Sequence, residues 1–185
     1  MSLIRPQSED DLELILHSSN KLAAAGELED ALAVCNWLIE DQRTAVAGLR
    51  QRAAVKLQFS DVDGAIRDLQ KVVSISPYEP ADFYFLGLQL LKVGSTVDAI
   101  SAFTSAIGAD VQAGSVYYTE GAFFFRAVCR LKMCDYDEAI ADLSSVGPGF
   151  KTHVANEGVR SREQILAEVE GALAQRSKFV FKLKK

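Results

Sequence analysis

Histidine and carboxylate side chains are the groups in this chain that could carry acid-base or metal chemistry, and their spacing supports neither. The two histidines, His17 and His153, lie far apart, and neither has a second histidine at helical spacing. No nucleophile elbow, phosphate-binding loop or dinucleotide-binding motif is present. We therefore expect a protein that is not an enzyme and that has no cofactor and no metal site.

Cysteine usage leads to the same expectation. The three cysteines, Cys35, Cys129 and Cys134, are an odd number without a Cys-x-x-Cys pair, which argues against a disulfide framework and against a zinc site. Because an unpaired cysteine behaves as a small hydrophobe, we expect three buried, reduced thiols. Paired carboxylates such as Asp135 and Asp137 fall at expected helix caps and turns, which accounts for them.

Composition bounds the class of protein. The 185 residues are 49% hydrophobic and 24% charged, as in an ordinary folded domain, and no apolar run is long enough to span a membrane. The acidic N-terminal region does not resemble a signal peptide, so we expect a cytoplasmic protein. The net charge of -5 is divided unevenly, with -6 over residues 1–43 and +3 over residues 152–185. This polarity fits a solvated acidic face with a basic tail, or the orientation of a charged partner.

A repeat with a period of 34 residues organises the chain. Alanines recur at Ala31, Ala65 and Ala99, and a fourth copy follows 40 residues later at Ala139. Such a period is typical of stacked helix-turn-helix repeats, and each copy reads as two amphipathic helices. The six extra residues fall between positions 110 and 120, where either the loop is longer or the next helix begins early, near Ser115.

These signals predict one α-solenoid domain over residues 1–185. Helix starts are expected at the capping pairs Ser8/Asp11, Ser60/Asp63, Ser95/Asp98 and Ser161/Gln164. A Gly-Pro-Gly turn at residues 147–149 interrupts the helical pattern. The expected segments are repeats at 10–43, 44–77, 78–111 and 118–151, a C-terminal capping helix at 161–176 and a basic tail at 177–185.

The third copy carries the clearest family likeness. It reads F-x-x-L-G-x-x-L from Phe83 and then A-x-x-x-F-x-x-A from Ala99, a pattern that resembles the tetratricopeptide repeat (TPR) family. Arg52 and Arg126 depart from it, since the family usually has leucine there. The resemblance covers about residues 8–151. It implies an all-α fold, a right-handed α-α superhelix of about four helix pairs plus the capping helix, with the first helix of each pair lining a concave groove.

The same resemblance implies which side chains face that groove. Carried onto this chain, the family's groove positions predict an apolar floor in the third and fourth copies, edged by cations. The predicted partner-binding residues are Arg50, Gln58, Tyr84, Leu88, Leu91, Lys92, Phe124, Val128, Leu131 and Lys132. A second interpretation is that several of them pack against the C-terminal helix folded over the groove. Leu16 and Asn20 stand where a chaperone-binding carboxylate clamp needs a Lys and Asn pair, which argues against that use.

We expect a non-catalytic protein-protein interaction module that binds another protein or peptide segment through its groove. The fourth copy and the helix from Ser161 resemble TPR proteins encoded beside bacterial toxins, which suggests an immunity protein for a secreted toxin. The alternatives are a TPR-type chaperone for secreted effectors and a homo-oligomeric scaffold. We expect a monomer or weak homodimer without nucleic-acid or membrane partners, because packing of the Lys178–Lys185 tail on the last repeat is favoured over contact with lipid or nucleic acid.

Overall fold

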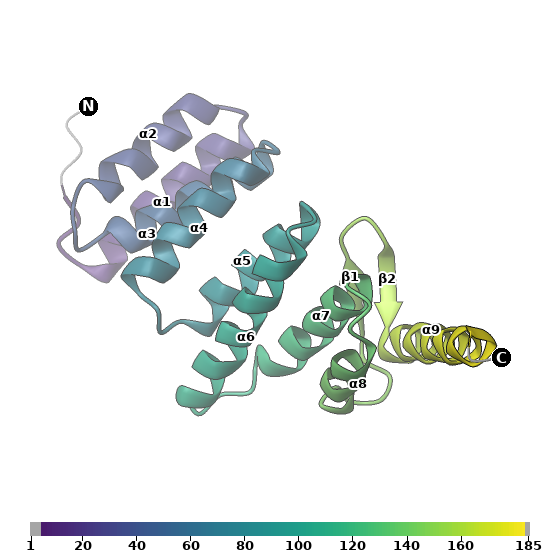
Figure 1. The fold of residues 1–185 in the computed structure, drawn as a ribbon. Coiled ribbons are helices and arrows are strands. Elements are labelled where there is room, and N and C mark those ends of the chain that lie inside the picture. The colour runs from purple at the N-terminus through teal and green to yellow at the C-terminus, as the bar shows by residue number, and fades with distance from the viewer. Residues whose placement is uncertain (1–4, 184–185) are drawn as a thin grey trace. The chain divides into compact units, whose positions relative to one another are not determined.

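Nine helices and one two-stranded hairpin make up the part of the chain that the structure describes (Figure 1). This computed structural model describes the backbone of residues 5–183 and the side chains of residues 5–176. The chain divides into two compact units, Met1–Pro77 and Tyr78–Lys185. The last helix continues into the predicted basic tail, of which residues 184–185 lie outside the described residues.

Unit 1 consists of two helix pairs. Their helices are α1 (Glu9–Ala24), α2 (Leu28–Ile39), α3 (Ala45–Gln58) and α4 (Val62–Ile75). Each helix packs against the next, and α1 also packs against α3. Small side chains, including Ala23, Ala31 and Cys35, are buried between them, which lets the helices approach closely.

Unit 2 consists of two further helix pairs, a hairpin and a last helix. Its elements are α5 (Pro80–Lys92), α6 (Thr96–Gln112), α7 (Thr119–Lys132), α8 (Tyr136–Ser144), β1 (Lys151–Val154), β2 (Gly158–Ser161) and α9 (Arg162–Leu183). The strands are antiparallel, with Thr152 opposite Arg160. Buried Ile165 and Val169 hold α9 against the helices α7 and α8. The expected all-α class, with four TPR-like helix pairs and a C-terminal helix, is confirmed, whereas the hairpin was not expected.

The turn inside each helix pair has the same geometry. One residue there is left-handed: Gly26, Ser60, Gly94 and Cys134 have φ of 85°, 65°, 79° and 59°. The next residue donates a backbone hydrogen bond of 2.8–2.9 Å to a carbonyl five positions earlier, as Ser95 does to Leu90. Glycine adopts this conformation at no steric cost, whereas serine and cysteine carry a conformational penalty. The repeat is therefore visible in the backbone itself.

Two of the four predicted caps are confirmed. Ser8 and Asp11 form a reciprocal capping box, and Ser161 and Gln164 bond each other's backbone amides at the start of α9. The Ser60 cap is wrong, since Ser60 is the left-handed turn residue and Asp61 accepts from the Gly64 amide instead. Ser95 donates to the Asp98 carboxylate rather than capping the backbone of α6.

The six extra residues of the fourth copy lengthen α6 and the loop after it. α6 runs to Gln112, and α7 begins only at Thr119, so the early helix start near Ser115 does not occur. Asp110, buried near the end of α6, accepts hydrogen bonds from the amides of Tyr118 and Thr119 and caps α7 from outside. The loop at 113–118 is thereby held against the start of α7.

Buried ion clusters account for the two arginines that depart from the TPR pattern. In unit 1, Arg52 on α3 donates two hydrogen bonds to Asp68 on α4 (2.9 and 2.6 Å) and a third to Asn36 on α2 (2.6 Å). Lys56 adds a bond of 2.7 Å to the same carboxylate. Burial alone would raise the pKa of Asp68, but the hydrogen bonds from Arg52 and Lys56 outweigh it and lower that pKa.

Unit 2 repeats this arrangement. Arg126 on α7 donates two bonds to Asp142 on α8 (3.0 and 2.6 Å) and one to Thr104 on α6 (2.9 Å), and Arg130 pairs with Asp142 at 2.6 Å. Each cluster thus joins three consecutive helices. The intervening pair α5–α6 has Leu86, Leu90 and Ala102 at the equivalent positions, all buried.

Candidate functional site

The hairpin of unit 2 lies on the side of α5 and α7 that the sequence predicts as the groove (Figure 1). We call this side, which carries Tyr84, Leu88, Lys92 and Lys132, the A-helix face of unit 2. Phe150, just before β1, packs on Phe124 of α7 with ring centroids 5.1 Å apart. The middle of the A-helix face is therefore already occupied by the chain itself.

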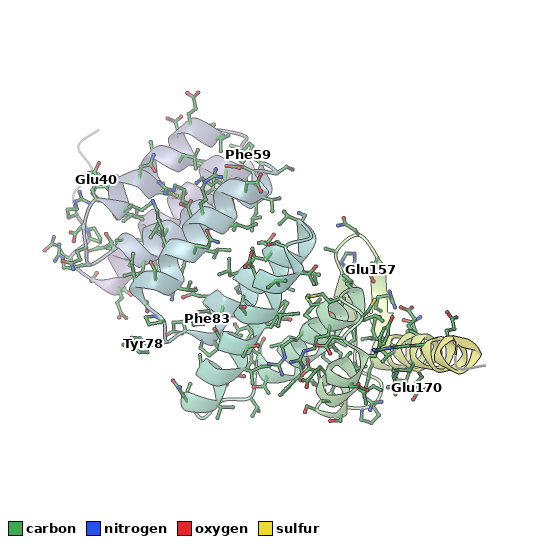
Figure 2. The ribbon with its side chains drawn as sticks, viewed as in Figure 1. Glu40, Phe59, Tyr78, Phe83, Glu157 and Glu170 are labelled. Carbon is green, nitrogen blue, oxygen red and sulfur yellow. The ribbon has the colours of Figure 1, made fainter. Side chains whose placement is uncertain are left out.

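Polar contacts fix the turn of the hairpin on the same face. The side-chain amide of Asn156 donates to the backbone carbonyl of Lys92 at the end of α5 (3.3 Å). Glu157, at the hairpin turn in Figure 2, forms an ion pair with Lys132 at the end of α7 and a second with Arg160 (2.6 Å). Arg160 also pairs with Glu168 of α9 (2.5 Å). This chain of charges connects α7, the hairpin and α9.

The hairpin leaves a hollow at each end of the A-helix face. The first, which we call the hairpin hollow, has a volume of about 410 Å³ and lies beside the turn of the hairpin. It is lined by Leu88, Gln89, Leu91, Lys92, Phe125, His153, Ala155 and Asn156. This lining combines apolar side chains with amides and one lysine, and it offers His153 no carboxylate or nucleophile as a catalytic partner.

The second hollow is aromatic and measures about 360 Å³. We call it the aromatic hollow, and its lining is Tyr84, Phe85, Tyr117, Tyr118, Glu120, Gly121 and Phe150. Burial raises the pKa of Tyr84 to about 12, so its hydroxyl is neutral at physiological pH. A Cβ at Gly121 would lie 2.8 Å from the Tyr84 hydroxyl, so glycine at this position lets α7 approach the ring.

The predicted site residues of unit 2 differ in how accessible they are. Leu88 and Lys92 line the hairpin hollow, and Tyr84 lines the aromatic hollow. Leu91, Phe124 and Val128 are only 7%, 0% and 1% exposed. Leu131 is half-buried, and Lys132 is exposed but paired with Glu157. Contact between a partner and Phe124 would therefore require Phe150 to leave the face.

Arg50 and Gln58, the predicted site residues of unit 1, are both exposed on α3. Gln58 donates from its side-chain amide to the carbonyl of Ala23 on α1 (3.0 Å), and Gln51 donates to Asn20 (2.7 Å). Amide side chains thus join α1 to α3. Partner binding by Arg50 and Gln58 stays a prediction.

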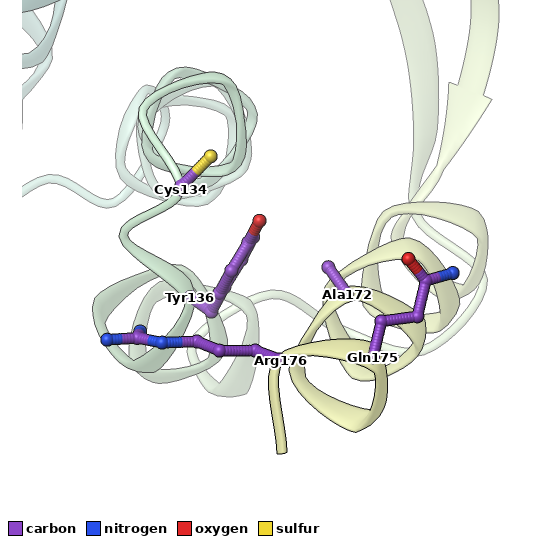
Figure 3. Close-up of a pocket in the computed structure, with 5 residues that line it drawn as sticks. All are labelled: Cys134, Tyr136, Ala172, Gln175 and Arg176. Atoms are coloured by element: carbon purple, nitrogen blue, oxygen red, sulfur yellow. The ribbon is translucent and has the colours of Figure 1, made fainter. Parts of the chain in front are cut away.

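A third hollow, of about 600 Å³, lies between the start of α8 and the helix α9. It is lined by Cys134, Tyr136, Ala172, Gln175 and Arg176, none of which the sequence predicted as a site residue (Figure 3). The Tyr136 ring points into the gap between Cys134 and Ala172 (Figure 3). Contact with the Cys134 thiol raises the pKa of Tyr136.

The groups that could carry chemistry lie apart in the structure. Cys35 and Cys129 are buried, as expected, and burial raises the pKa of Cys129 to about 12, so it remains a neutral thiol. Cys134 is exposed, which corrects the expectation of three buried thiols, because it is the left-handed turn residue before α8. Over residues 5–176, histidine, cysteine and carboxylate side chains form no group of three suited to hold a metal. None of the helices, as far as they are described, is both long and apolar enough to span a membrane.

No protein-family model matches this sequence, and no curated protein matches it significantly. Solved structures do match. The crystal structure of the MamA protein superposes with a TM-score of 0.70 at 18% identity, covering 93% of this chain and 87% of that one. YrrB, whose description reads "a TPR protein with an unusual peptide-binding site", gives a TM-score of 0.63 at 18% identity, covering 88% of this chain and 76% of that one. A tetratricopeptide repeat protein from Parabacteroides merdae gives 0.66 at 13% identity, covering 88% and 60%.

The chain has a TPR fold. The likeness rests on structure rather than on sequence, so it supports the arrangement of helices and leaves the binding residues to be argued from the surface of this chain. The A-helix face of unit 2, which the sequence predicts as the groove side, carries two hollows beside the hairpin.

Proposed function

We propose that this chain is a non-catalytic protein-binding module that recognises a segment of one partner protein on the A-helix face of unit 2, beside the seated hairpin. The observation that carries the proposal is the hairpin hollow, where the predicted residues Leu88 and Lys92 meet Asn156 of the hairpin. Apolar surface next to a few hydrogen-bonding groups is the usual composition of a recognition site.

Some predicted site residues can contact a partner, and others are buried and support the face. Lys92 is exposed at the rim of the hairpin hollow and Leu88 is half-buried in its wall, so both can meet a partner. Phe124, on which Phe150 packs, and Val128 are buried and support the face from within. YrrB offers a precedent within the TPR fold, because its description assigns it a peptide-binding site.

The specific use of such a module is a finer proposal. An immunity protein would bind one folded toxin and abolish its activity, whereas an effector chaperone would bind an unfolded segment of its client. The mixed lining of the hairpin hollow suits an extended segment that inserts an apolar side chain beside Lys92. We therefore retain both uses and the homo-oligomeric scaffold as hypotheses that identification of the partner will separate.

Comparative affinity capture tests the proposal. The tagged wild-type chain and the Lys92→Glu variant are used as baits in extracts of the native host, and captured proteins are quantified by mass spectrometry. Lys71→Glu is the matched control, since Lys71 is equally exposed but lies on α4 of unit 1. We expect one protein to be enriched by the wild type and the control, and about tenfold less by Lys92→Glu, because the variant both removes a contact and reverses the charge at the hollow.

Two results would contradict the proposal. Equal capture by Lys92→Glu and the wild type would move the binding site away from the hairpin hollow. Turnover of a small molecule by the purified chain, lost on His153→Ala but not on Lys92→Glu, would replace the binding function with an enzymatic one.

A further inference from the structure

The aromatic hollow is lined in part by exposed aromatic rings, those of Tyr117 and Phe85. Tyr117 is 82% exposed, and its ring meets Tyr118 edge to face with centroids 4.9 Å apart. Tyr118 is tilted over Tyr84 at 5.3 Å and meets Phe85 at 6.4 Å. We call Tyr117 and Tyr118 the platform. Tyr118 packs on Tyr84 and Phe85, and this holds the platform in place while the Tyr117 ring stays accessible to solvent.

This platform comes from the extra residues of the fourth copy. The loop at 113–118 that carries Tyr117 and Tyr118 is longer than the connections between the other helix pairs, which have five residues (40–44) and four residues (76–79) and carry no such aromatic pair. Asp110 fixes the end of the loop through the amides of Tyr118 and Thr119 (2.9 and 2.8 Å). An exposed aromatic pair held in a fixed place is the kind of feature that serves binding.

Negatively charged side chains lie near the platform. Glu120 lines the aromatic hollow, and no lysine or arginine does. Burial raises the pKa of Tyr118, and Asp110, Asp82 and Glu79 add to the effect through their negative charges. Glu120 accepts from the Gly147 amide with Oε1 (2.8 Å), which leaves Oε2 able to accept from another donor. Tyrosine faces with carboxylates at their rim form a site for a cation.

We propose that the aromatic hollow binds a cationic side chain, arginine in particular, presented by a segment of the partner protein. The guanidinium would lie against the rings of Tyr117 and Tyr118 and pair with the carboxylate of Glu120, which lines the hollow. Arginine fits better than lysine, because its planar group stacks on a ring and donates in two directions at once. This inference rests on the proposed function and adds a second, chemically distinct contact at the other end of the A-helix face.

The test uses the full chain and two synthetic probes, acetyl-Leu-Arg-Leu-amide and its twin with neutral citrulline in place of arginine. Binding is followed by amide chemical shifts in a two-dimensional NMR titration. We expect the arginine probe to shift the amides of residues 117–121, and the citrulline twin to bind about fivefold more weakly, as for loss of a cation from an aromatic site. High salt is expected to weaken only the arginine probe.

Three variants test whether the arginine probe binds in the aromatic hollow. Tyr117→Ala is expected to weaken binding of the arginine probe about threefold to tenfold, in the range of one cation-aromatic contact. Glu120→Gln removes the charge but keeps an acceptor for the Gly147 amide, and it is expected to weaken binding about twofold to fivefold, in the range of one exposed ion pair. Tyr78→Ala is the matched control, since Tyr78 is also a strongly exposed tyrosine but does not line the hollow, and it is expected to bind as the wild type does.

Equal binding of the two probes, or unchanged binding in Tyr117→Ala, would overturn the inference. Tighter binding of a peptide with the sequence of residues 178–185 at the same amides would also overturn it, because the occupant would then be a second copy of this chain. If captured partner is lost from Lys92→Glu but retained fully by Tyr117→Ala, the proposed function stands and this inference falls. If captured partner is lost from Tyr117→Ala but retained by Lys92→Glu, the aromatic hollow binds the partner and the hairpin hollow does not.

Discussion

The two units share a buried ion cluster and differ in the side chains on the predicted groove side. Both carry a buried carboxylate, Asp68 in unit 1 and Asp142 in unit 2, that an arginine joins to three helices. Their groove sides differ, because α1 and α3 are joined by amide side chains, whereas α5 and α7 present leucine and aromatic rings beneath the hairpin. An apolar face must be covered and a polar one need not be.

This difference changes the meaning of the apolar floor predicted in the third and fourth copies. Phe124 and Val128 are both buried, and Phe150 packs on Phe124, so their apolar character alone does not indicate a partner. The accessible rings and the lysine at the two hollows remain as the evidence for binding.

The largest expected effect on stability comes from breaking the buried ion clusters. Replacing the carboxylate in Asp68→Ala or Asp142→Ala leaves an arginine largely buried without its counter-charge, and we expect each to lower the free energy of unfolding by about 3 kcal/mol or more. Urea denaturation followed by circular dichroism measures it. The matched control is the triple change Arg126→Leu, Arg130→Leu and Asp142→Ala, which copies Leu86, Leu90 and Ala102 of the preceding pair.

We expect the triple variant to recover most of the stability that Asp142→Ala loses, because packed leucine can replace a buried ion cluster. A triple variant no more stable than Asp142→Ala would show that the two versions of the helix pair are not interchangeable. That result would remove the equivalence between the clusters and the apolar pair.

The next largest effect is expected where Phe150 packs on the A-helix face of unit 2. Phe150→Ala removes the ring that packs on Phe124, and we expect a loss of about 2 kcal/mol, since the ring is only partly buried. Amides of Lys151–Val154 should then exchange with solvent faster, as mass spectrometry can measure. Val159→Ala is the control, because that side chain is exposed on β2. Equal exchange in both variants would mean that Phe150 does not hold the hairpin.

A smaller effect is expected from pH in unit 1. The folded-state pKa of Asp68 lies below its ordinary value of 3.8, so its carboxylate stabilises the fold above that pH. This contribution is lost as pH falls from about 4 through the lower folded pKa, where the carboxylate takes up a proton. Urea midpoints at several values between pH 5 and pH 2 should fall less steeply for Asp68→Asn. Parallel curves for the two proteins would contradict the assignment.

The smallest effect is expected at the turns. Ser60 has a φ of 65°, and Ser60→Gly should stabilise the chain by about 0.5–1 kcal/mol by removing the left-handed penalty. The reverse change, Gly94→Ala, should destabilise by a similar amount, because an added Cβ at Gly94 meets no atom within 4 Å and the cost is conformational only. Opposite signs in thermal melts would support the shared turn geometry, and a destabilised Ser60→Gly would contradict it.

Periodicity made the helix pairs predictable, because each turn and each small buried residue recurs at a fixed interval. Ala31, Ala65, Ala99 and Ala139 are all fully buried, as close helix packing requires. The carboxylate partners of Arg52 and Arg126 were missed, although each lies 16 residues further on, at Asp68 and Asp142. A pair of charges at the same separation in two copies was the signal.

The hairpin could not be read from the repeat, because it occurs once and lies outside the period. Its strands are four residues long, too short for a clear alternation of apolar and polar side chains. The signal that was available is Asn156 with Gly158, two residue types that favour a turn and that both adopt positive φ in the structure, between Val154 and Val159. Which predicted groove residues the hairpin would bury depends on its docking, and no local pattern encodes that.

The most direct test of the account is to lock the hairpin onto α5 and ask whether the partner still binds. Lys92→Cys and Asn156→Cys, in a Cys134→Ser background, put two thiols on neighbouring residues, since the Asn156 side chain lies 3.3 Å from the Lys92 carbonyl. Because the lock itself removes Lys92, the reduced form of the same protein serves as the reference for capture. The account predicts that the disulfide forms on mild oxidation and that the locked protein captures as much partner as its reduced form. Capture that appears only after reduction would contradict the claim that the partner binds beside a seated hairpin.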